Sequence, residues 1–300
     1  MGESSNPPKL SIVLPAKNEA PGLSALLPRL TEGFPDAEII VIDDGSTDET
    51  VGICKDAGVK CFSHPYSMGN GAAVKSGARQ AQGSTIIFMD ADGQHDPNDI
   101  PRLLAKMEEG YEMVVGARSV QSHASWPRRI ANGVYNRLAS YMADHAIADL
   151  TSGFRAVRAR HFRRFLYLFP NGFSYPTTST MAFFRSGLPV AYVPIDAGKR
   201  SGRSHIKIVK DGFRFLLVIL KIGALFSPMR LFLPIALSLT LTGLLYYAYT
   251  FWVFHRFTNM SALLLTSALM IFLIGILAEL VSSLHYREAD SERRMLKRDE

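Results

Sequence analysis

The chain has 300 residues, 47% hydrophobic and 20% charged, which is enough for one sizeable domain and an appendage. The net charge is +6, and residues 199–230 hold eight basic residues against one acid, directly before an apolar segment. This placement favours attraction to a membrane surface, and the absence of a nucleic-acid recognition pattern argues against a nucleic-acid partner.

Residues 1–9 carry no regular pattern, and we expect them to be disordered. They also contain no apolar stretch typical of a signal peptide, so the region that follows is expected to stay in the cytoplasm.

From residue 10 onward, apolar strand-like runs alternate with helical patterns. Strands are predicted at 10–15, 38–43, 59–63, 85–89 and 113–116, and helices at 20–30, 48–57, 71–81 and 99–109. This alternation predicts an open α/β sheet, in which a ligand site lies beyond the carboxyl ends of the strands.

Residues 208–230 mix apolar and basic side chains, which predicts an amphipathic helix lying in a membrane interface. Residues 126–141 mix arginines with aromatic side chains in a similar way. For this second stretch, a surface helix and an interfacial helix remain equal alternatives.

Two apolar segments follow, at 231–254 and about 261–284, and each is long enough to cross a hydrocarbon core of about 30 Å as a helix. We expect a two-helix transmembrane hairpin over 231–284, in preference to two buried core helices. Basic residues flank the pair on both outer sides, whereas only Arg256 lies in the connecting loop. The positive-inside rule therefore places the large domain and the charged tail, 285–300, in the cytoplasm of a cell-membrane protein. The role of Glu279 within a span is open.

Acidic residues follow two of the predicted strands. Asp43 and Asp44 end the second strand, and Asp90 and Asp92 follow the fourth. Because such strand ends converge on one crevice, Asp90 and Asp92 are candidate ligands for a hard divalent cation that completes its shell with substrate phosphates. Asp48 precedes a predicted helix, so helix capping is its favoured role.

The glycine-rich stretch from Met68 to Gly77 does not follow the phosphate-loop pattern, because Val74 precedes Lys75 where glycine is needed. Helix-start amides facing a phosphate and close backbone packing remain competing explanations for its glycines.

An ordered set of motifs resembles glycosyltransferase family 2, and more narrowly the polyprenyl-phosphate glycosyltransferases that include dolichol-phosphate-mannose synthase. The matching segments are IVLPAKNE, VIDDGSTDET, GNGAAVKSG, MDADGQHDP, VVGARS, TSGFRAV and KRSGRSHIK. The resemblance implies a GT-A catalytic domain, a Rossmann-like α/β fold, over residues 10–207. The C-terminal hairpin resembles that of one subgroup of the family.

The resemblance also implies residue roles. Four residues match positions that hold the donor nucleoside, namely Pro15, Lys17, Glu19 and Asp44. Asp90 and Asp92 match the metal and diphosphate ligands, and Gln94 follows them in the matching position. Arg118, Arg128 and Asn132 match contacts to the acceptor phosphate, with Arg129 as a competing register. Arg200, Ser204 and His205 match a loop that closes over the diphosphate, where either His205 or Lys207 supplies the last positive charge.

The implied reaction is transfer of a single hexose from a nucleotide-diphospho-sugar to a polyprenyl phosphate, with inversion and with Mg²⁺ or Mn²⁺ bound. The residues with catalytic roles are then Asp92, Gln94 and Arg200. A polysaccharide or other glycolipid glycosyltransferase, or a non-catalytic nucleotide-sugar-binding relative, are the alternatives. The sugar, the base (uracil or guanine) and the lipid (dolichyl or undecaprenyl) are not readable from these motifs. A homo-oligomer is a further expectation from the hairpin-bearing relatives.

Overall fold

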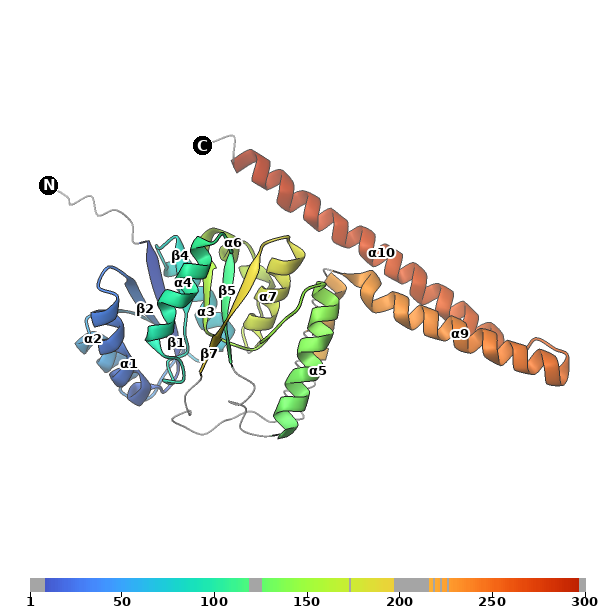
Figure 1. Ribbon diagram of the computed structural model, residues 1–300, viewed down its shortest axis with the longest axis horizontal. Coiled ribbons are helices and arrows are strands. Elements are labelled where there is room, and N and C mark those ends of the chain that lie inside the picture. Colours follow the sequence, from blue (N-terminus) through green and yellow to red (C-terminus); the bar gives the residue numbers. More distant parts are fainter. Residues whose placement is uncertain are drawn as a thin grey trace. The chain divides into compact units, whose positions relative to one another are not determined.

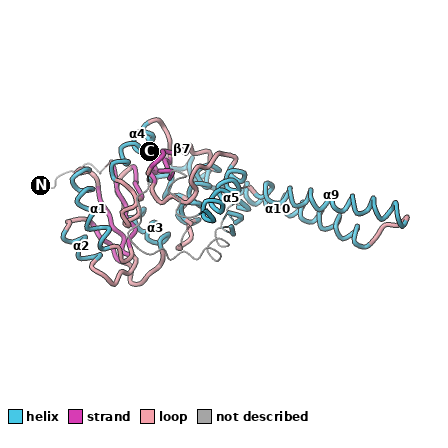
Figure 2. The backbone as a smooth tube through the Cα atoms, turned by 60° about the horizontal axis from the view of Figure 1, so that its bottom comes forward, coloured by secondary structure: helices cyan, strands magenta, loops and turns pink. Residues whose placement is uncertain are grey.

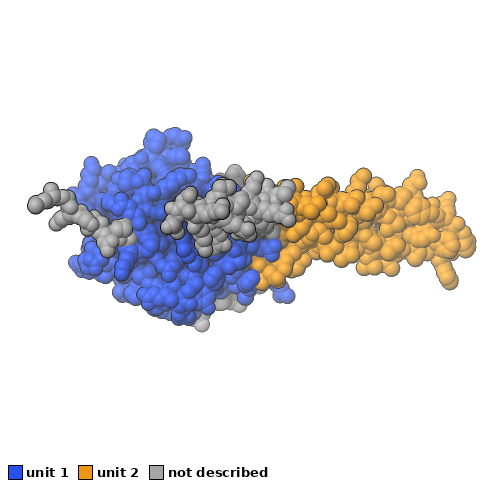
Figure 3. Space-filling view, turned by 90° about the horizontal axis from the view of Figure 1, so that it is seen from above, with its two compact units in different colours: residues 1–137, 145–218 blue, residues 138–144, 219–300 orange. Residues whose placement is uncertain are grey.

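The structure is a computed structural model that describes residues 9–118, 126–172, 174–196, 216–217, 219–221, 223–225 and 227–296, without the side chains of 126–132 and 284–296. The chain divides into two compact units (Figure 3). Unit 1 comprises residues 1–137 and 145–218, and unit 2 comprises residues 138–144 and 219–300. This boundary lies beyond the predicted domain end at residue 207.

Unit 1 is built on a seven-stranded sheet with the order β3-β2-β1-β4-β6-β5-β7 (Figure 1). The strands are β1 Leu10–Ala16, β2 Glu38–Asp43, β3 Lys60–Ser63, β4 Thr85–Phe88, β5 Met113–Arg118, β6 Arg155–Arg158 and β7 Val190–Ile195. β1, β2, β3 and β4 are mutually parallel, as expected for a buried α/β sheet with continuous apolar runs.

Strand β6 is the exception, because it runs antiparallel to both β4 and β5. Its first residue, Arg155, pairs with Phe88 at the end of β4. The loop that leads into β6 therefore arrives at the edge of the sheet where β4 and β5 end. Sequence analysis predicted the first five strands and missed β6 and β7.

Helices cover both faces of the sheet, and successive side chains of β1 point alternately to one helical layer and to the other. Ile12 and Leu14 pack against α1 Ala20–Gly33, α2 Thr50–Asp56 and α4 Ile100–Glu108. Val13 faces the other way, onto the layer of α3 Asn70–Gln80, α6 Ala159–Arg164 and α7 Tyr175–Arg185. Within the described residues of this unit, the other elements are the 3₁₀ turns η1 Pro97–Asp99 and η3 Leu166–Leu168, and helix α5 Trp126–Ala143, whose end belongs to unit 2.

The glycine-rich stretch opens α3, and its glycines serve close packing. A Cβ on Gly71 would lie 2.0 Å from the carbonyl oxygen of Pro170. The amides of Gly71 and Ala72 donate to the carbonyls of Gly172 and Asn171, so protein carbonyls occupy these helix-start donors. Of the two explanations that the sequence left open, the structure supports packing.

Unit 2 contains two long antiparallel helices, α9 Pro228–Phe254 and α10 Asn259–Leu296, which run side by side (Figures 1 and 2). Pro228–Phe254 and Asn259–Ser283 have mean hydropathies of 1.7 and 2.4, long and apolar enough to cross a membrane. The two helices approach closely at glycines: a Cβ on Gly243 would meet Leu265, and one on Gly275 would meet Phe232. Small residues at such contacts are typical of helix pairs in lipid.

Glu279 acquires a structural role within unit 2. Its Oε2 accepts the backbone N–H of Met229 at 3.3 Å, in the first turn of α9, where helical amides have no intrahelical partner. Ser282 Oγ donates to the carbonyl of Leu225 at 2.7 Å nearby in the same unit. The acid therefore stabilises the start of the neighbouring helix.

The predicted interfacial helix at 208–230 is covered only in part. Its first eight residues lie outside the described part of the chain, and residues 216–217, 219–221 and 223–225 are helical. The C-terminal tail also differs in detail, because α10 continues through residue 296 instead of ending near 284.

Candidate active site

Acidic side chains gather where β2 and β4 end, as the strand pattern predicted. Asp43 ends β2 and Asp44 follows it, with 3% and 4% exposed, and Asp92 lies just past β4 with 8% exposed. Lys17 follows β1, which lies between these two strands, and is itself exposed. The carboxyl ends of adjacent parallel strands share one edge, which is where open α/β sheets bind ligands.

The Asp44 carboxylate is held by four donors. Oδ1 lies 2.8 Å from His64 Nδ1 and accepts the Met68 amide, while Oδ2 accepts the Ser67 hydroxyl and the Gly69 amide, each at 2.8 Å. Burial alone would raise the pKa of Asp44, but these hydrogen bonds outweigh it and lower the pKa below its ordinary value. Asp44 therefore fixes the loop that leads into α3.

Lys17 joins this network through Ser67. Its Nζ donates to Ser67 Oγ at 2.8 Å, and the same hydroxyl donates to Asp44. The predicted donor-side residues Lys17 and Asp44 are thus linked by one serine, which sequence reading did not single out. Pro15, two residues before Lys17, is buried in β1 and pairs with Ile42 of β2.

Asp48 ties together the starts of two helices, in agreement with its predicted capping role. Oδ1 accepts the backbone N–H and the hydroxyl of Thr50 in α2, and Oδ2 accepts the N–H of Ala20 in α1. Glu19, the residue before α1, donates its own backbone N–H to the Thr50 hydroxyl at 3.2 Å. These bonds fix the turn that carries the predicted residues Lys17 and Glu19.

Asp90, Asp92 and Gln94 lie on the loop between β4 and η1. The backbone N–H of Gln94 donates to Asp92 Oδ1 at 3.1 Å, which shapes the turn. Gly153 packs directly on Asp90, where a Cβ would lie 2.7 Å from Oδ2. Two carboxylates and one amide oxygen form a donor set of hard oxygens that suits Mg²⁺ or Mn²⁺. The described residues contain no group of three or more His, Cys, Asp or Glu side chains placed to hold a metal ion, so substrate oxygens would complete such a shell.

Arg118, at the end of β5, makes an ion pair with Asp149. Its Nε lies 2.8 Å from Oδ2 and its Nη2 lies 3.1 Å from Oδ1, and the two side chains are 25% and 8% exposed. Burial would lower the pKa of Arg118, but its hydrogen bonds to the Asp149 carboxylate and the charges of Asp149, Asp90 and Asp92 raise it. The guanidinium is therefore firmly charged and close to the predicted metal ligands.

Two buried groups beside this edge were not predicted from the sequence. His95 is 5% exposed and stacks on Phe154 with ring centroids 5.1 Å apart, and burial lowers its pKa against the opposing charges of Asp90 and Asp92. Arg155 is fully buried and donates to Ser179 Oγ at 2.7 Å and to the carbonyls of Pro176 and Ser152. Because β6 begins with this charged residue, its sequence lacks the apolar run from which a strand would be predicted.

The remaining predicted residues are not tested by the geometry. The side chains of Arg128 and Asn132, near the start of α5, lie outside the described residues, as does the competing Arg129. Arg200, Ser204, His205 and Lys207 also fall in a stretch that the structure does not describe. Their roles remain predictions.

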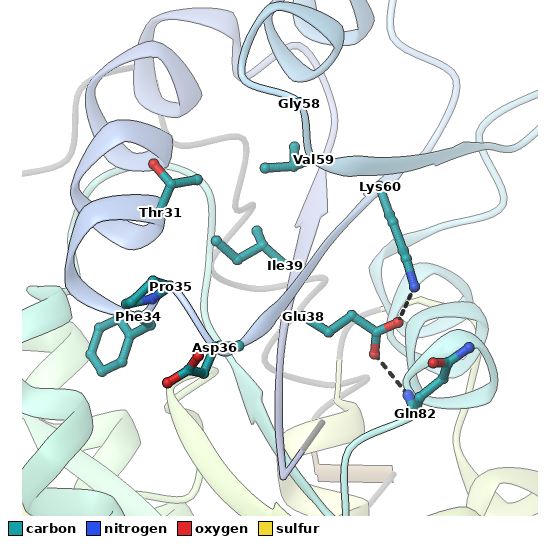
Figure 4. A pocket seen from close by; sticks show the side chains of 11 residues that line it. Thr31, Phe34, Pro35, Asp36, Glu38, Ile39, Gly58, Val59, Lys60 and Gln82 are labelled. Atoms are coloured by element: carbon teal, nitrogen blue, oxygen red, sulfur yellow. Dashed lines mark hydrogen bonds and ion pairs between the residues drawn. The ribbon is translucent and has the colours of Figure 1, made fainter. Parts of the chain in front are cut away.

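A hollow of about 400 Å³ lies at the opposite edge of the sheet, where β2 begins. Figure 4 shows Glu38 bonded there to the Lys60 side chain and to the backbone N–H of Gln82. Ser11 Oγ also donates to Glu38, at 2.6 Å. With its carboxylate oxygens already engaged, Glu38 holds three parts of the chain together, and the strand-end carboxylates are the stronger site candidate.

Comparison with known proteins gives matches to two family models and to related proteins. Residues 11–166 match the model of glycosyl transferase family 2, and residues 227–284 match that of the GtrB C-terminal hairpin. The chain is 27% identical over 294 residues to glycosyltransferase AglJ of Haloferax volcanii, covering 93% of this chain and 95% of that protein. It is 36% identical over 163 residues to an undecaprenyl-phosphate 4-deoxy-4-formamido-L-arabinose transferase of Enterobacter sp. (strain 638), covering 51% of this chain and 49% of that protein.

Solved structures share the fold. Glucosyl-3-phosphoglycerate synthase of Mycobacterium tuberculosis, crystallised with Mn²⁺, UDP-glucose and phosphoglyceric acid, superposes with a TM-score of 0.58 at 20% identity, covering 72% of this chain and 79% of that one. Mannosyl-3-phosphoglycerate synthase of Rubrobacter xylanophilus gives a TM-score of 0.52 at 16% identity, with 72% of each chain covered. These similarities confirm the predicted GT-A fold.

The Asp44 network predicts an acid-sensitive contribution to stability. We expect Asp44→Asn to lower the free energy of unfolding by about 1–3 kcal/mol at neutral pH, because buried donors lose a charged acceptor. Since the folded-state pKa of Asp44 is lowered, this stabilisation is present above about pH 4 and is lost as the pH falls through the folded-state pKa. Thermal unfolding of both proteins in detergent across this pH range measures the effect.

The exposed Asp36→Asn, which removes the same charge, is the matched control and should change little. A gap between wild type and Asp44→Asn that stays constant, or widens, as the pH falls below about 4 would contradict the assignment.

Proposed function

The chain belongs to glycosyl transferase family 2, and from that membership we propose that it transfers a single hexose from a UDP- or GDP-linked donor to a polyprenyl phosphate. The observation that carries the proposal is a strand-end site in unit 1 of a chain whose unit 2 has two helices long and apolar enough to cross a membrane, within the segment matched to the GtrB hairpin. The name of the Enterobacter relative, an undecaprenyl-phosphate transferase, supports a polyprenyl-phosphate acceptor.

On the donor side, Lys17, Ser67 and Asp44 are joined by hydrogen bonds, and we propose that they contact the nucleoside. Asp90, Asp92 and Gln94 are proposed to offer oxygens to the metal and the diphosphate. A divalent cation bound there supplies positive charge that stabilises the leaving nucleoside diphosphate. Asp92 and Gln94 are proposed to orient that part of the donor, and Arg200 is proposed to add charge from the loop that follows β7.

On the acceptor side, Arg118 provides a permanently charged guanidinium next to the donor carboxylates. Arg128 and Asn132 are proposed as further phosphate contacts. A phosphate oxygen is already anionic near neutral pH, so its attack on the anomeric carbon needs orientation more than a general base. The bond from the anomeric carbon to the leaving phosphate oxygen breaks as the new bond forms, which inverts the configuration.

We propose that the catalytic domain and the C-terminal tail face the cytoplasm. Basic residues flank both outer ends of the hairpin, and Arg256 is the only Lys or Arg in the connection between α9 and α10, residues 255–258. Protease added to sealed inside-out vesicles should therefore digest the catalytic domain, whereas right-side-out vesicles should protect it. Protection in inside-out vesicles, with digestion after detergent is added, would reverse the assignment.

The function is tested by a transfer assay on detergent-purified full-length protein. Polyprenyl phosphate and Mg²⁺ or Mn²⁺ are offered with a panel of labelled UDP- and GDP-sugars, and label is counted in the lipid phase. Transfer from one donor, absent when polyprenol without phosphate replaces the acceptor, is the expected result. Label that enters a water-soluble polymer, or no label in lipid from any donor, would reject the proposal.

Asp92→Asn tests the proposed metal and diphosphate site. Replacing the carboxylate by a neutral amide should reduce metal-dependent transfer by about 100-fold or more, because a Lewis-acid contribution of several kcal/mol is lost. The melting temperature should change little. The control is Asp96→Asn, which removes an acid of the same loop that pairs with Arg29 at the surface. Equal activity of Asp92→Asn and wild type would exclude Asp92 as a ligand.

A further inference from the structure

The ion pair between Arg118 and Asp149 uses one edge of the guanidinium. Asp149 accepts from Nε and Nη2, and Thr151 Oγ1 accepts a further bond from Nη2. Among the described residues no hydrogen bond reaches Nη1. Arg118 is therefore held along one edge, with its other terminal nitrogen left for a phosphate oxygen.

We propose that Asp149 and Asn136 are positioning residues that fix Arg118 for the acceptor phosphate, and this inference rests on the proposed function. The expected contact is end-on, through Nη1, because a bidentate approach to Nε and Nη2 would have to displace a buried carboxylate. Neither Asp149 nor Asn136 belongs to a motif that the sequence analysis used.

Asp149 is itself held in place, which gives the pair its rigidity. Its Oδ1 accepts the backbone N–H groups of Thr151 at 2.9 Å and Ser152 at 3.2 Å. Burial would raise the pKa of Asp149, but the hydrogen bond and charge of Arg118 and the backbone amides of Thr151 and Arg118 lower it. The carboxylate is thus anionic and anchored to its own loop before any ligand arrives.

Asn136, on α5, hydrogen-bonds to the backbone of the loop that contains Asp149. Its Nδ2 donates to the carbonyl of Ala148 at 2.9 Å, and its Oδ1 accepts the N–H of Leu150 at 3.2 Å. These two backbone groups lie on either side of Asp149 in sequence. One amide side chain therefore clamps the loop at the residue that holds Arg118.

The physical benefit is the ordering of a long side chain before binding. A free arginine loses much of its rotamer freedom when it grips a phosphate, and that loss weakens binding. The negative charge of Asp149 acts in the opposite direction, because it repels a phosphate. If repulsion dominated, removal of Asp149 would tighten acceptor binding, so the two roles differ in the sign of the effect.

Binding and kinetics of Asp149→Asn and Asn136→Ala test the proposal. A soluble short-chain polyprenyl phosphate is titrated calorimetrically into full-length protein in detergent, and KM is measured for acceptor and donor. Both variants should raise the acceptor Kd and KM about tenfold and leave the donor KM unchanged. Unchanged or tighter acceptor binding by Asp149→Asn would overturn the positioning role.

A double-mutant cycle separates positioning from damage to the loop. In an Arg118→Ala background, adding Asp149→Asn should change the acceptor Kd no further, because the group to be positioned is gone. A full additional loss there, or a matching rise in the donor KM, would show a purely structural role and reject the proposal. The control is Glu38→Gln, which removes a buried paired carboxylate at the opposite edge and should lower the melting temperature alone.

The calorimetric binding measurement also distinguishes failure of this inference from failure of the proposed function. Wild-type protein that binds the short-chain phosphate without transferring sugar would contradict the function. The same acceptor Kd in wild type and in Asp149→Asn would contradict the positioning role instead.

Discussion

Four aspartates lie buried at one edge of the sheet, and each buried carboxylate must be supplied with hydrogen-bond donors or a counter-charge. Asp44 obtains donors from the loop before α3, and Asp149 obtains them from its own loop and from Arg118. Asp43 and Asp92 accept the amides of Ser46 and Gln94. The backbone of these loops is therefore arranged around the carboxylates, and the loop conformations in turn determine the shape of the site.

The part of the site that sequence predicted depends on parallel strands. Continuous apolar runs followed by acids identify β2 and β4, and the rule that parallel strand ends share an edge brings Asp44 and Asp92 together. Strand β6 escaped prediction because Arg155 opens a four-residue segment with no apolar run, and its burial depends on distant carbonyls and hydroxyls. Since β6 delivers the loop of Asp149, that residue escaped as well.

Two other sequence patterns, a glycine-rich helix start and an acid in an apolar segment, each had more than one structural explanation, and only the packing distinguishes them. A glycine-rich helix start provides both free amides and room for another backbone, and in α3 the carbonyls of Asn171 and Gly172 take the amides. An acid in an apolar segment is equally ambiguous, because Glu279 lies fifty residues from its partner Met229. Local sequence contains no information on either partner, whereas Asp48, whose partner Thr50 is two residues away, was predicted correctly.

The chemistry of the hairpin is consistent with anchoring more than with recognition. Hydroxyls along α9 donate to carbonyls of their own helix, as Thr240 does to Ala236 and Thr242 does to Ser238. Such internal bonds leave few polar groups unsatisfied in a lipid environment, where an unpaired donor is costly. Polar contacts between different segments of unit 2 gather instead at the start of α9, where Ser227 donates to Met142 and Arg230 pairs with Asp144. Met142 lies near the end of α5 and Asp144 follows it, so these contacts join the start of α9 to the C-terminal end of α5 within unit 2.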